Sequence, residues 1–295
     1  MADGTPRDCS TNGCGSQADT SIIRDRDIRS GKASPLGRTQ GNGPVDAASV
    51  IRTFMSGGNN APTNNGASGA SGVEDDLSGL KGAAGGNRNN SARKRQIADL
   101  FKGILGGGGD GNGKTGLAGL AGGGGKKNNF KAETLVADTA GDGATSGLPT
   151  ADDNGEISMV FRQVCSLIDL IICNTNTPQI NQDGAGPLTA AVDGTSGGTD
   201  ASAFQNAEVT QDIPGLGIQG LSLATNTEFP LKVKMPQGMT CDASVGGANN
   251  VCVVRVRNGA AAGPFGGSAA FTQSNTARKR AIAYRLKKRM EINRQ

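Results

Sequence analysis

Apolar and polar positions alternate along three segments in the second half of the chain, which is the pattern of half-buried β-strands. These segments are residues 155–163 (GEISMVFRQ), 228–236 (EFPLKVKMP) and 250–258 (NVCVVRVRN). The positions predicted to face a core are Ile157, Met159 and Phe161; Phe229, Leu231, Val233 and Met235; and Cys252, Val254 and Val256. The opposite faces hold Lys232 and Lys234 in the second segment, and Val253, Arg255 and Arg257 in the third.

Turn-forming residues separate these segments. Glycine, proline and aspartate gather at 183–187 (DGAGP), 193–200 (DGTSGGTD), 236–240 (PQGMT) and 263–267 (GPFGG). Pro230 and Pro236 indicate a strand edge or end, because proline cannot donate a ladder hydrogen bond. Helical signals are confined to 44–58 (PVDAASVIRTFMSGG), between Pro44 and Gly57. Short strands with frequent turns predict an all-β fold, an antiparallel immunoglobulin-like β-sandwich with one short helix.

Glycine changes this picture in the first half of the chain. There are 48 glycines among 295 residues, and aromatic residues make up 3%. Most of the region 56–129 is glycine and small polar residues, which bury too little apolar surface to offset the entropy of ordering them. We therefore predict a disordered Gly-rich insertion at 56–129. It divides one β domain into a first part, 1–55, and a main part, 130–275.

Positive charge is concentrated in a basic C-terminal tail, 276–295. The net charge of the chain is +4, but the tail carries +7, so the rest of the chain is −3. Such a tail is found in segments that bind anionic polymers or membranes, but the favoured interpretation is a solvated or processed terminus. The tetrapeptide ARKR occurs at 92–95 and again at 277–280. It suggests processing after Arg95 and Arg280, with incidental charge runs as the alternative.

The chain contains no histidine, which excludes serine–histidine and cysteine–histidine catalysis and histidine-ligated metals within this sequence. The sequence contains no C-x-x-C motif, which would indicate a zinc site, and no metal site is predicted. Residues 108–115 (GGDGNGKT) match the phosphate-loop pattern, but their glycine-rich flanks lack the required strand and helix, so we interpret the match as chance. No stretch is apolar over the roughly 20 residues of a membrane span, and no nucleic-acid partner is predicted.

The more specific motifs resemble a known family. They are GTPRDCS (4–10), TSIIRDRDI (20–28), LGRTQGNGPVD (36–46), NQDGAGPLTA (181–190), EVTQDIPG (208–215), FPLKVKMPQGMTC (229–241), NVCVVRVRN (250–258) and AAAGPFGGSAAFTQS (260–274). In this order they resemble the Egh-type (GAS/MAS) virulence-factor family of fungal pathogens, which is associated with the appressorium. The Gly-rich insertion and the basic tail are similar to the GAS branch of that family.

The resemblance implies a secreted virulence factor that acts at the host surface during appressorium-mediated penetration and is not an enzyme. The alternative is a copper-dependent polysaccharide monooxygenase-like protein that acts on or binds cell-wall polysaccharide. Copper would require a histidine from a missing N-terminal exon, and no cofactor is expected otherwise. A carbohydrate-binding module is a third interpretation, although this chain has no Trp and one Tyr for stacking on sugars.

The start of the chain departs from the family pattern. Relatives carry a signal peptide and a further segment before the GTPRDCS-like motif, and their mature chains often begin with His-Gly. This sequence opens with Met1, Ala2 and Asp3 and shows no signal peptide. The comparison therefore predicts a missing exon, with an extracellular location implied by the resemblance.

Residues 164–179 (VCSLIDLIICNTNTPQ) also depart from the family, whose members run directly from the ISMVFRQ-like strand into INQDGAGP. Val-Cys can be encoded by GTATGT and a terminal Gln by CAG, which are typical fungal intron boundaries. Deleting these codons leaves the reading frame intact. The hypothesis is a retained intron, and the alternative is a genuine loop insertion with an apolar strand.

Without the two cysteines of that segment, the chain has Cys9, Cys14, Cys241 and Cys252. The short spacing suits Cys9–Cys14 and Cys241–Cys252 disulfides in an oxidising compartment, although four cysteines allow three pairings and buried free thiols are the alternative.

Charged and turn residues inside the family motifs are the candidate ligand-binding positions. They are Arg24, Asp25, Arg26, Asp183, Arg255, Arg257 and Phe265, with Asp27, Pro187, Asn258 and Pro264 beside them. Arg255 and Arg257 lie two apart in a predicted strand and therefore on one face. Such a face could bind an acidic or hydroxylated polymer, such as a host or fungal cell-surface polysaccharide. The structural alternative is that the prolines set turns and the charges cover an exposed strand face.

Overall fold

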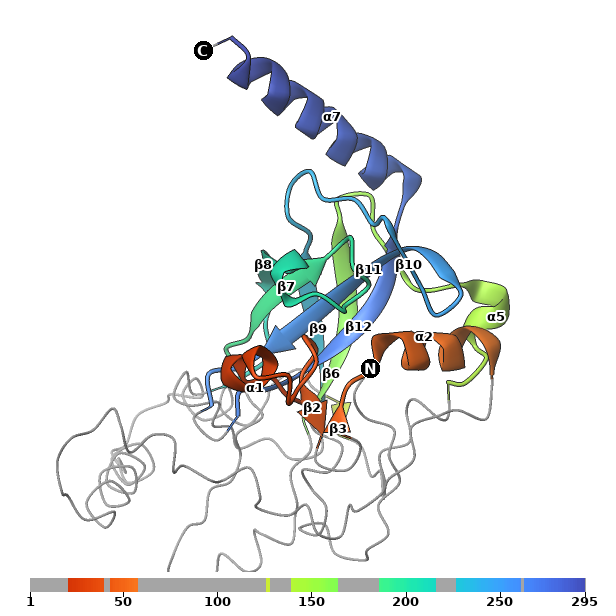
Figure 1. The fold of residues 1–295 in the computed structure, drawn as a ribbon, viewed down its shortest axis with the longest axis vertical. Coiled ribbons are helices and arrows are strands. Elements are labelled where there is room, and N and C mark those ends of the chain that lie inside the picture. Colours follow the sequence, from red (N-terminus) through yellow and green to blue (C-terminus); the bar gives the residue numbers. More distant parts are fainter. Residues whose placement is uncertain are drawn as a thin grey trace, which may run out of the picture.

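The computed structural model of the chain describes residues 21–39, 43–57, 126–127, 139–163, 186–215, 227–260 and 263–294 (Figure 1). The strands of these residues are β1 (Ser21–Ile22), β2 (Arg38–Thr39), β3 (Gly43–Pro44), β4 (Lys126–Lys127), β5 (Thr150–Ala151), β6 (Glu156–Gln163), β7 (Thr189–Asp193), β8 (Gln205–Gln211), β9 (Thr227–Lys234), β10 (Ala243–Val245), β11 (Ala248–Arg257) and β12 (Phe265–Gln273). The helices are α1 (Asp25–Arg29), α2 (Ala47–Ser56), α5 (Gly143–Ser146) and α7 (Asn275–Ile292), with a 3₁₀ turn, η3, at Ala201–Ala203.

Antiparallel pairing dominates the sheet, in the order β3-β2-β1-β12-β11-β7-β8-β9-β4. Strand β6 pairs with β9 along its length, from Glu156 opposite Lys234 to Gln163 opposite Thr227. Strand β10 forms a hairpin with β11, and the short β5 runs parallel to β12. The prediction of a mostly antiparallel β fold is confirmed.

The main core takes apolar side chains from strands along the whole sheet. It includes Ile157 of β6, Phe229, Leu231 and Val233 of β9, Val192 of β7, Cys252, Val254 and Val256 of β11, and Phe271 of β12. Because β6 and β9 share this core with β11 and β12, which lie several strands away in the sheet order, the sheet bends around it. All the positions predicted to face a core are buried or partly buried in this cluster.

Strand β11 is buried on both faces, and the prediction that Val253 belongs to a polar outer face is wrong. Val253 is 0% exposed and packs in a second cluster with Ile51 of α2, Leu36 and Val251. Alternation along one strand cannot show that a helix covers its other face. The arginines of the same face, Arg255 and Arg257, lie beyond this cluster and are partly exposed.

Helix α2 has the ends that the sequence predicts. The side chain of Asp46 caps its N-terminus by accepting a hydrogen bond from the Ser49 backbone N–H at 3.1 Å. Gly57 ends the helix in the left-handed conformation, with φ of 65°. Val50, Ile51 and Thr53 are buried on one side, so the helix stabilises the second cluster by covering it.

Helix α7 corrects the prediction of a single helix. The basic tail forms an 18-residue helix whose N-terminus is capped by Ser274, the side chain of which accepts from the Ala277 N–H at 3.1 Å. Two further short helices, α1 and α5, were also missed. The apolar repeat in the tail is narrow and lies among many charges, but its alanine, arginine, lysine and leucine residues are strong helix formers.

The predicted turns at 193–200 and 236–240 are present. Asp193 is buried and holds the first turn by accepting from the backbone N–H groups of Thr195, Ser196 and Gly198 at 2.7–2.9 Å. The predicted turn at 263–267 ends early, because Phe265 already begins β12. Pro230 lies inside β9 and is paired with Val160 of β6 on one side. On the other side, β9 pairs with β4 at residues 227–228 and with β8 at residues 232–234, and Pro230 falls between these two stretches. Its missing N–H therefore costs no ladder bond on that side.

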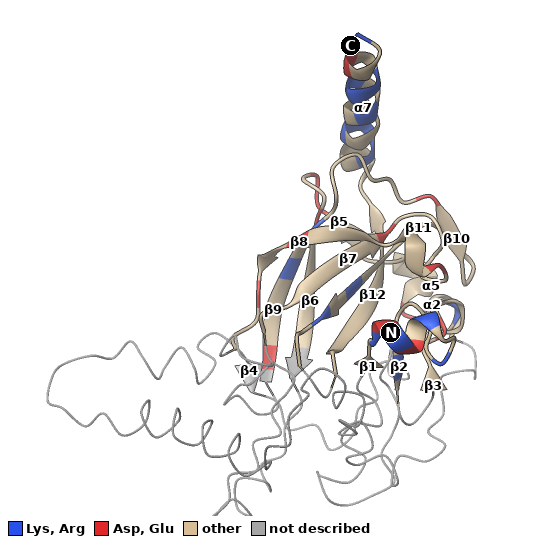
Figure 2. Ribbon diagram, turned by 60° about the vertical axis from the view of Figure 1, so that its left-hand side comes forward, with Lys and Arg blue, Asp and Glu red and all other residues tan. Residues whose placement is uncertain are grey.

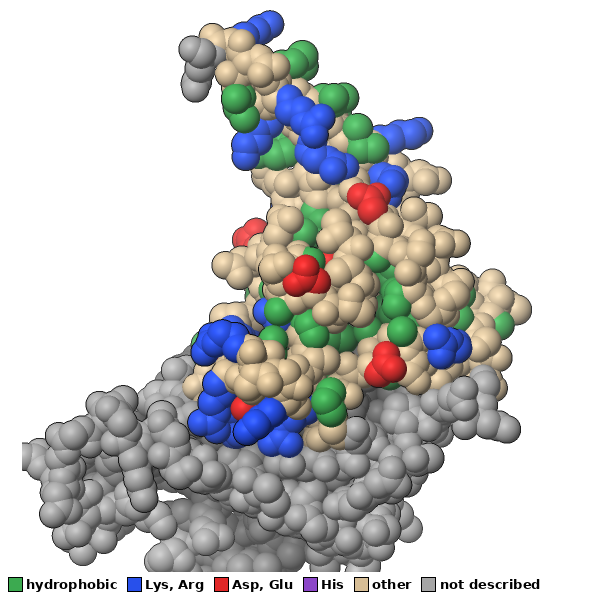
Figure 3. Space-filling model, in the orientation of Figure 1, with side chains coloured by type: hydrophobic (Ala, Val, Ile, Leu, Met, Phe, Trp, Pro, Cys, Tyr) green, Lys and Arg blue, Asp and Glu red, His purple; other side chains and the backbone are tan. Residues whose placement is uncertain are grey.

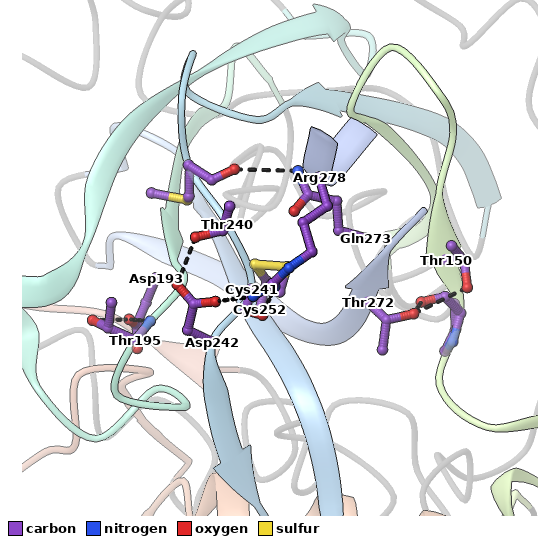
Figure 4. Close-up of a disulfide and its surroundings, with 12 residues drawn as sticks. Thr150, Asp193, Thr195, Thr240, Cys241, Asp242, Cys252, Thr272, Gln273 and Arg278 are labelled. Atoms are coloured by element: carbon purple, nitrogen blue, oxygen red, sulfur yellow. Dashed lines mark hydrogen bonds and ion pairs between the residues drawn. A yellow bond between two sulfur atoms is a disulfide. The ribbon is translucent and has the colours of Figure 1, made fainter. Parts of the chain in front are cut away.

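A disulfide joins Cys241 to Cys252 and ties the chain before β10 to β11, as expected (Figure 4). Cys9 and Cys14 lie outside the described residues, as do the segment 164–179 and nearly all of the region 56–129. Among the described residues, no helix combines the length and apolar character needed to cross a bilayer.

Candidate functional site

The N-terminal segment 21–39 lies against the ends of β11 and β12, and this contact assembles most of the candidate residues. Strand β1 pairs with the start of β12, with Ile22 opposite Phe265. The Ile23 N–H donates to the Pro264 carbonyl at 2.8 Å, which continues the pairing beyond the strand. Helix α1 follows directly and lies at the end of β11, where Arg255 and Arg257 are (Figure 1).

Phe265 is the apolar anchor of this contact. Its side chain is 5% exposed and packs with Ile22 and Ala260. Asn258 holds the turn between β11 and β12, because its side-chain oxygen accepts from the N–H groups of Ala260 at 3.1 Å and Phe265 at 3.0 Å. The structure therefore gives Phe265 and Asn258 packing and turn-forming contacts.

Arg257 and Asp25 form a two-pronged ion pair across this contact. One guanidinium nitrogen of Arg257 lies 2.6 Å from Asp25 Oδ1 and the other lies 3.3 Å from Oδ2. The first nitrogen also donates to the Ile23 carbonyl at 3.2 Å. The hydrogen bond from Arg257 holds the pKa of Asp25 below its ordinary value, because it stabilises the ionised carboxylate.

Arg255 and Arg24 make two more links to backbone carbonyls. Arg255 donates to the Pro35 carbonyl at 2.6 Å, and its guanidinium lies 4.3 Å from the centre of the Phe204 ring. This cation–π contact and the burial of Arg255 fix the side chain in place; burial, and next the charge of Arg257, lower its pKa. The Nε of Arg24 donates to the Gly263 carbonyl at 2.7 Å. We call Arg24, Asp25, Arg255 and Arg257 the arginine clamp, because together they fasten segment 21–39 to the sheet.

Around the clamp, α1 presents a basic surface. Arg26, Arg29 and Lys32 are exposed; Figure 2 shows basic positions along α1, and Figure 3 shows basic side chains gathered in that region. Asp27 lies beneath them, 8% exposed, at 3.6 Å from Arg26 and 3.8 Å from Arg38. We call Arg26, Arg29 and Lys32 the α1 basic face. Sequence analysis identified Arg26 and missed the other two, although the charge count of residues 24–32 contains the signal.

The candidate residues thus fall into three groups. Arg24, Asp25, Arg255, Arg257 and Phe265 meet at one end of the sheet, and Arg26 lies beside them. Asp183 is outside the described residues, and Pro187 is exposed beside a different strand, β7. Phe204 was not foreseen, because it reaches Arg255 from a turn 51 positions earlier in the sequence. Ligand binding by any of these residues stays a prediction.

The predicted processing site at Arg280 lies in α7. Arg280 is exposed and donates to the Asp153 carbonyl at 2.8 Å and to the Asn154 side chain at 3.2 Å. Arg95 is outside the described residues, and cleavage at either position stays a prediction. Within the described part of the chain, no group of three or more His, Cys, Asp or Glu side chains is placed to hold a metal ion.

Comparison with known proteins agrees with the motifs found in the sequence. The chain is 49% identical over 287 residues to the appressoria-specific virulence factor GAS2 of Pyricularia oryzae, an alignment that covers 97% of this chain and 81% of the relative. It is 33% identical over 171 residues to the appressoria-specific virulence factor GAS1 of the same fungus, covering 56% of this chain and 58% of that relative. No solved structure matches significantly. The family model of the Egh16-like virulence factors matches residues 1–266, and the chain belongs to this family.

Proposed function

We propose that this chain is a secreted, non-enzymatic virulence factor of a fungal pathogen that acts at the host surface during appressorium-mediated penetration. The observation that carries the proposal is its 49% identity to an appressoria-specific virulence factor over 97% of its length. The alignment covers 287 of the 295 residues, so the similarity extends over nearly the whole chain rather than over one motif.

The Cys241–Cys252 disulfide supports the secreted part of the proposal. Both cysteines are 0% exposed and the bond joins the segment before β10 to the central strand β11. Disulfides of this structural kind form and persist in oxidising compartments and are rare in the cytosol. A secreted protein therefore suits this core better than a cytosolic one.

The α1 basic face supports a binding role at a surface that carries acidic or hydroxylated polymers. Arg26, Arg29 and Lys32 are exposed on a segment that the arginine clamp and Phe265 hold against the sheet. Cations on a fixed support lose less conformational freedom on binding than cations on a loose tail. The proposed partner is therefore a host or fungal cell-surface polysaccharide with carboxylate or hydroxyl groups.

Replacement of the fungal gene tests the role in virulence. A strain lacking the gene should form appressoria but penetrate host epidermis less often, and the wild-type gene should restore penetration. Mass spectrometry of fluid from the infection site should detect peptides of 139–163, and peptides of 227–260 that contain the intact Cys241–Cys252 bond. Normal penetration by the deletion strain, or a protein found in the cytosol with both thiols free, would refute the proposal.

A charge-matched pair of variants tests the binding role. The triple variant R26Q/R29Q/K32Q removes the α1 basic face, while R52Q/K234Q/K279Q removes three positive charges from exposed positions elsewhere. We expect the first to lose retention on pectate or cell-wall material and the second to keep it. Equal loss in both would show that only net charge matters. Release of soluble oligosaccharides by the purified wild-type chain would instead show an enzyme.

A further inference from the structure

One face of α7 is fixed to the body of the protein. Ala277 and Ala281 are 5% and 8% exposed. Arg278 donates to the Cys241 carbonyl at 2.7 Å and lies 2.7 Å from Asp242 Oδ1 (Figure 4). Arg285 donates to Thr240 at 2.9 Å. Positions 277, 281 and 285 are four apart and so lie on one side of the helix. The helix is therefore held at its first turns beside the disulfide.

The side of the helix turned away from Ala277 and Ala281 carries exposed apolar side chains. Ile282, Leu286 and Met290 are 40%, 53% and 58% exposed. Leu286 and Met290 lie five residues after Ala281 and Arg285, about 140° round the helix from them, while Ile282 lies to the side, four residues after Arg278 and three before Arg285. We call these three residues the outer stripe. Figure 1 shows α7 standing out from the sheet, and the end residue Ile292 is 63% exposed.

Basic side chains surround the outer stripe. Helix α7 contains seven Lys or Arg residues and one Glu, and Figure 2 shows basic positions along much of its length. Arg278 and Arg285 are engaged with the body, but Lys279, Lys287 and Arg289 are exposed beside the stripe. Apolar residues bordered by cations on a solvent-exposed helix are typical of helices that lie in the interface of an anionic bilayer.

Charge decides between the possible occupants of this face. A second copy would bring two helices of strongly positive charge together, which opposes self-association. A polyanion without an apolar phase would pair with the cations and leave the outer stripe in water. An anionic bilayer accommodates both the cations and the outer stripe, because its phosphates attract the cations while the headgroup boundary accepts the apolar side chains.

We propose that α7 docks this protein on anionic lipid bilayers, with Ile282, Leu286 and Met290 in the headgroup boundary and the flanking lysines and arginines on lipid phosphates. This site goes beyond the proposed function and is independent of it, because it lies on another element from the α1 basic face. The body anchors the helix at Arg278 and Arg285, so docking would hold the whole domain at the membrane.

Vesicle flotation of the full chain tests this proposal. The wild-type protein should float with vesicles of phosphatidylcholine and phosphatidylserine and remain behind with phosphatidylcholine alone. The variant I282Q/L286Q/M290Q should bind anionic vesicles about tenfold or more weakly, because glutamine keeps helix propensity while removing the apolar surface. The variant V160Q, which changes a 68% exposed apolar residue on β6, should bind like wild type.

Two further measurements keep the test decisive. Circular dichroism and thermal unfolding of the outer-stripe variant should match wild type, since its three side chains face solvent. Sedimentation velocity should show a monomer at the same concentrations. Failure to bind anionic vesicles, equal binding to neutral vesicles, or undiminished binding by the outer-stripe variant would overturn the proposal. So would a wild-type dimer that the variant abolishes, because a second copy would then cover the stripe.

Discussion

The two ends of the molecule are both basic, but they use their charges differently. At the α1 end, Arg24, Arg255 and Arg257 point at carbonyls and a carboxylate of the same chain, and they fasten a segment to the sheet. In α7, Arg278 and Arg285 do the same near the helix start, while Lys287, Lys288 and Arg289 are exposed. Figure 2 shows the two regions far apart. A count of basic residues therefore does not identify a binding surface until the intramolecular acceptors are known.

The support beneath each end also differs. Segment 21–39 is held by β pairing, by the buried Phe265 and by the arginine clamp. Helix α7 is held by two small buried alanines and by hydrogen bonds to residues next to the disulfide. A change at Phe265 should therefore loosen segment 21–39 and leave α7 in place, and loss of the disulfide should do the reverse. Hydrogen exchange of the two segments measures this difference.

Phe265→Ala should have the largest effect of the changes considered. Removing a buried phenylalanine leaves a cavity and is expected to lower the free energy of unfolding by about 4 kcal/mol. Because Phe265 packs on Ile22 and pairs with it across β1 and β12, hydrogen exchange should accelerate most in 21–39. Chemical denaturation and hydrogen-exchange mass spectrometry measure the two effects. Equal acceleration in α7 would mean that the two ends are not independent.

The double variant C241A/C252A should produce the reciprocal pattern. Loss of a disulfide that closes a short loop is expected to cost about 3 kcal/mol. Arg278 bonds to the Cys241 carbonyl and to Asp242, so α7 should lose exchange protection while segment 21–39 keeps it. The reduced wild-type protein is the matched control and should behave like the variant. Unchanged protection in α7 would show that the disulfide does not support the helix anchor.

Local sequence patterns predicted the strands well, because alternation is a property of each segment alone. The inward residues of β6, β9 and β11 all reach the main core. Val253 was misplaced because its burial depends on α2, which a strand pattern cannot show. Helix α7 was missed because its apolar repeat of Ile282, Leu286 and Met290 is narrow and lies among charges, so that the Ser274 cap and helix propensity are its main signals.

For the candidate site, the sequence motifs indicated residues that meet in the fold, while ligand binding by them stays a prediction. Sequence analysis selected Arg24, Asp25, Arg255, Arg257 and Phe265, and the structure brings all five to one end of the sheet. The sequence could not provide the hydrogen-bond partners of these residues. Arg255 and its partner Pro35 are 220 positions apart, and Arg24 and its partner Gly263 are 239 apart. Such contacts depend on the sheet order, which the alternation of single strands does not determine.

A double-mutant cycle on Asp25 and Arg257 should give a smaller effect. The pair is two-pronged but the Asp25 side chain is 55% exposed, so solvent screening limits the coupling energy to about 1 kcal/mol. R257Q alone should cost more than D25N alone, because Arg257 also donates to the Ile23 carbonyl. Urea unfolding of the four proteins measures the coupling. No coupling would mean that the clamp is held by its carbonyl contacts rather than by the ion pair.

The smallest expected effect is a difference between the acid titrations of Asp25 at the α1 end and Asp242 at the α7 end. The pKa of Asp25 is lowered mainly by the hydrogen bond from Arg257, whereas the pKa of Asp242 at the α7 anchor is lowered mainly by the hydrogen bond from Thr240, with Arg278 a lesser cause. A carboxyl with a lowered pKa stabilises the fold above its ordinary pKa of 3.8, and this stability is lost as pH falls through the folded value.

Carboxyl NMR titration of single variants therefore distinguishes the two sites. R257Q should return the pKa of Asp25 most of the way to its ordinary value, while R278Q should leave most of the shift of Asp242 in place. Denaturation between pH 7 and pH 3 should show the same asymmetry, with D25N reducing the acid sensitivity of wild type but hardly changing that of R257Q. If R278Q abolished the shift of Asp242, the α7 anchor would depend on its ion pair as the arginine clamp does, and the two ends would be alike in this respect.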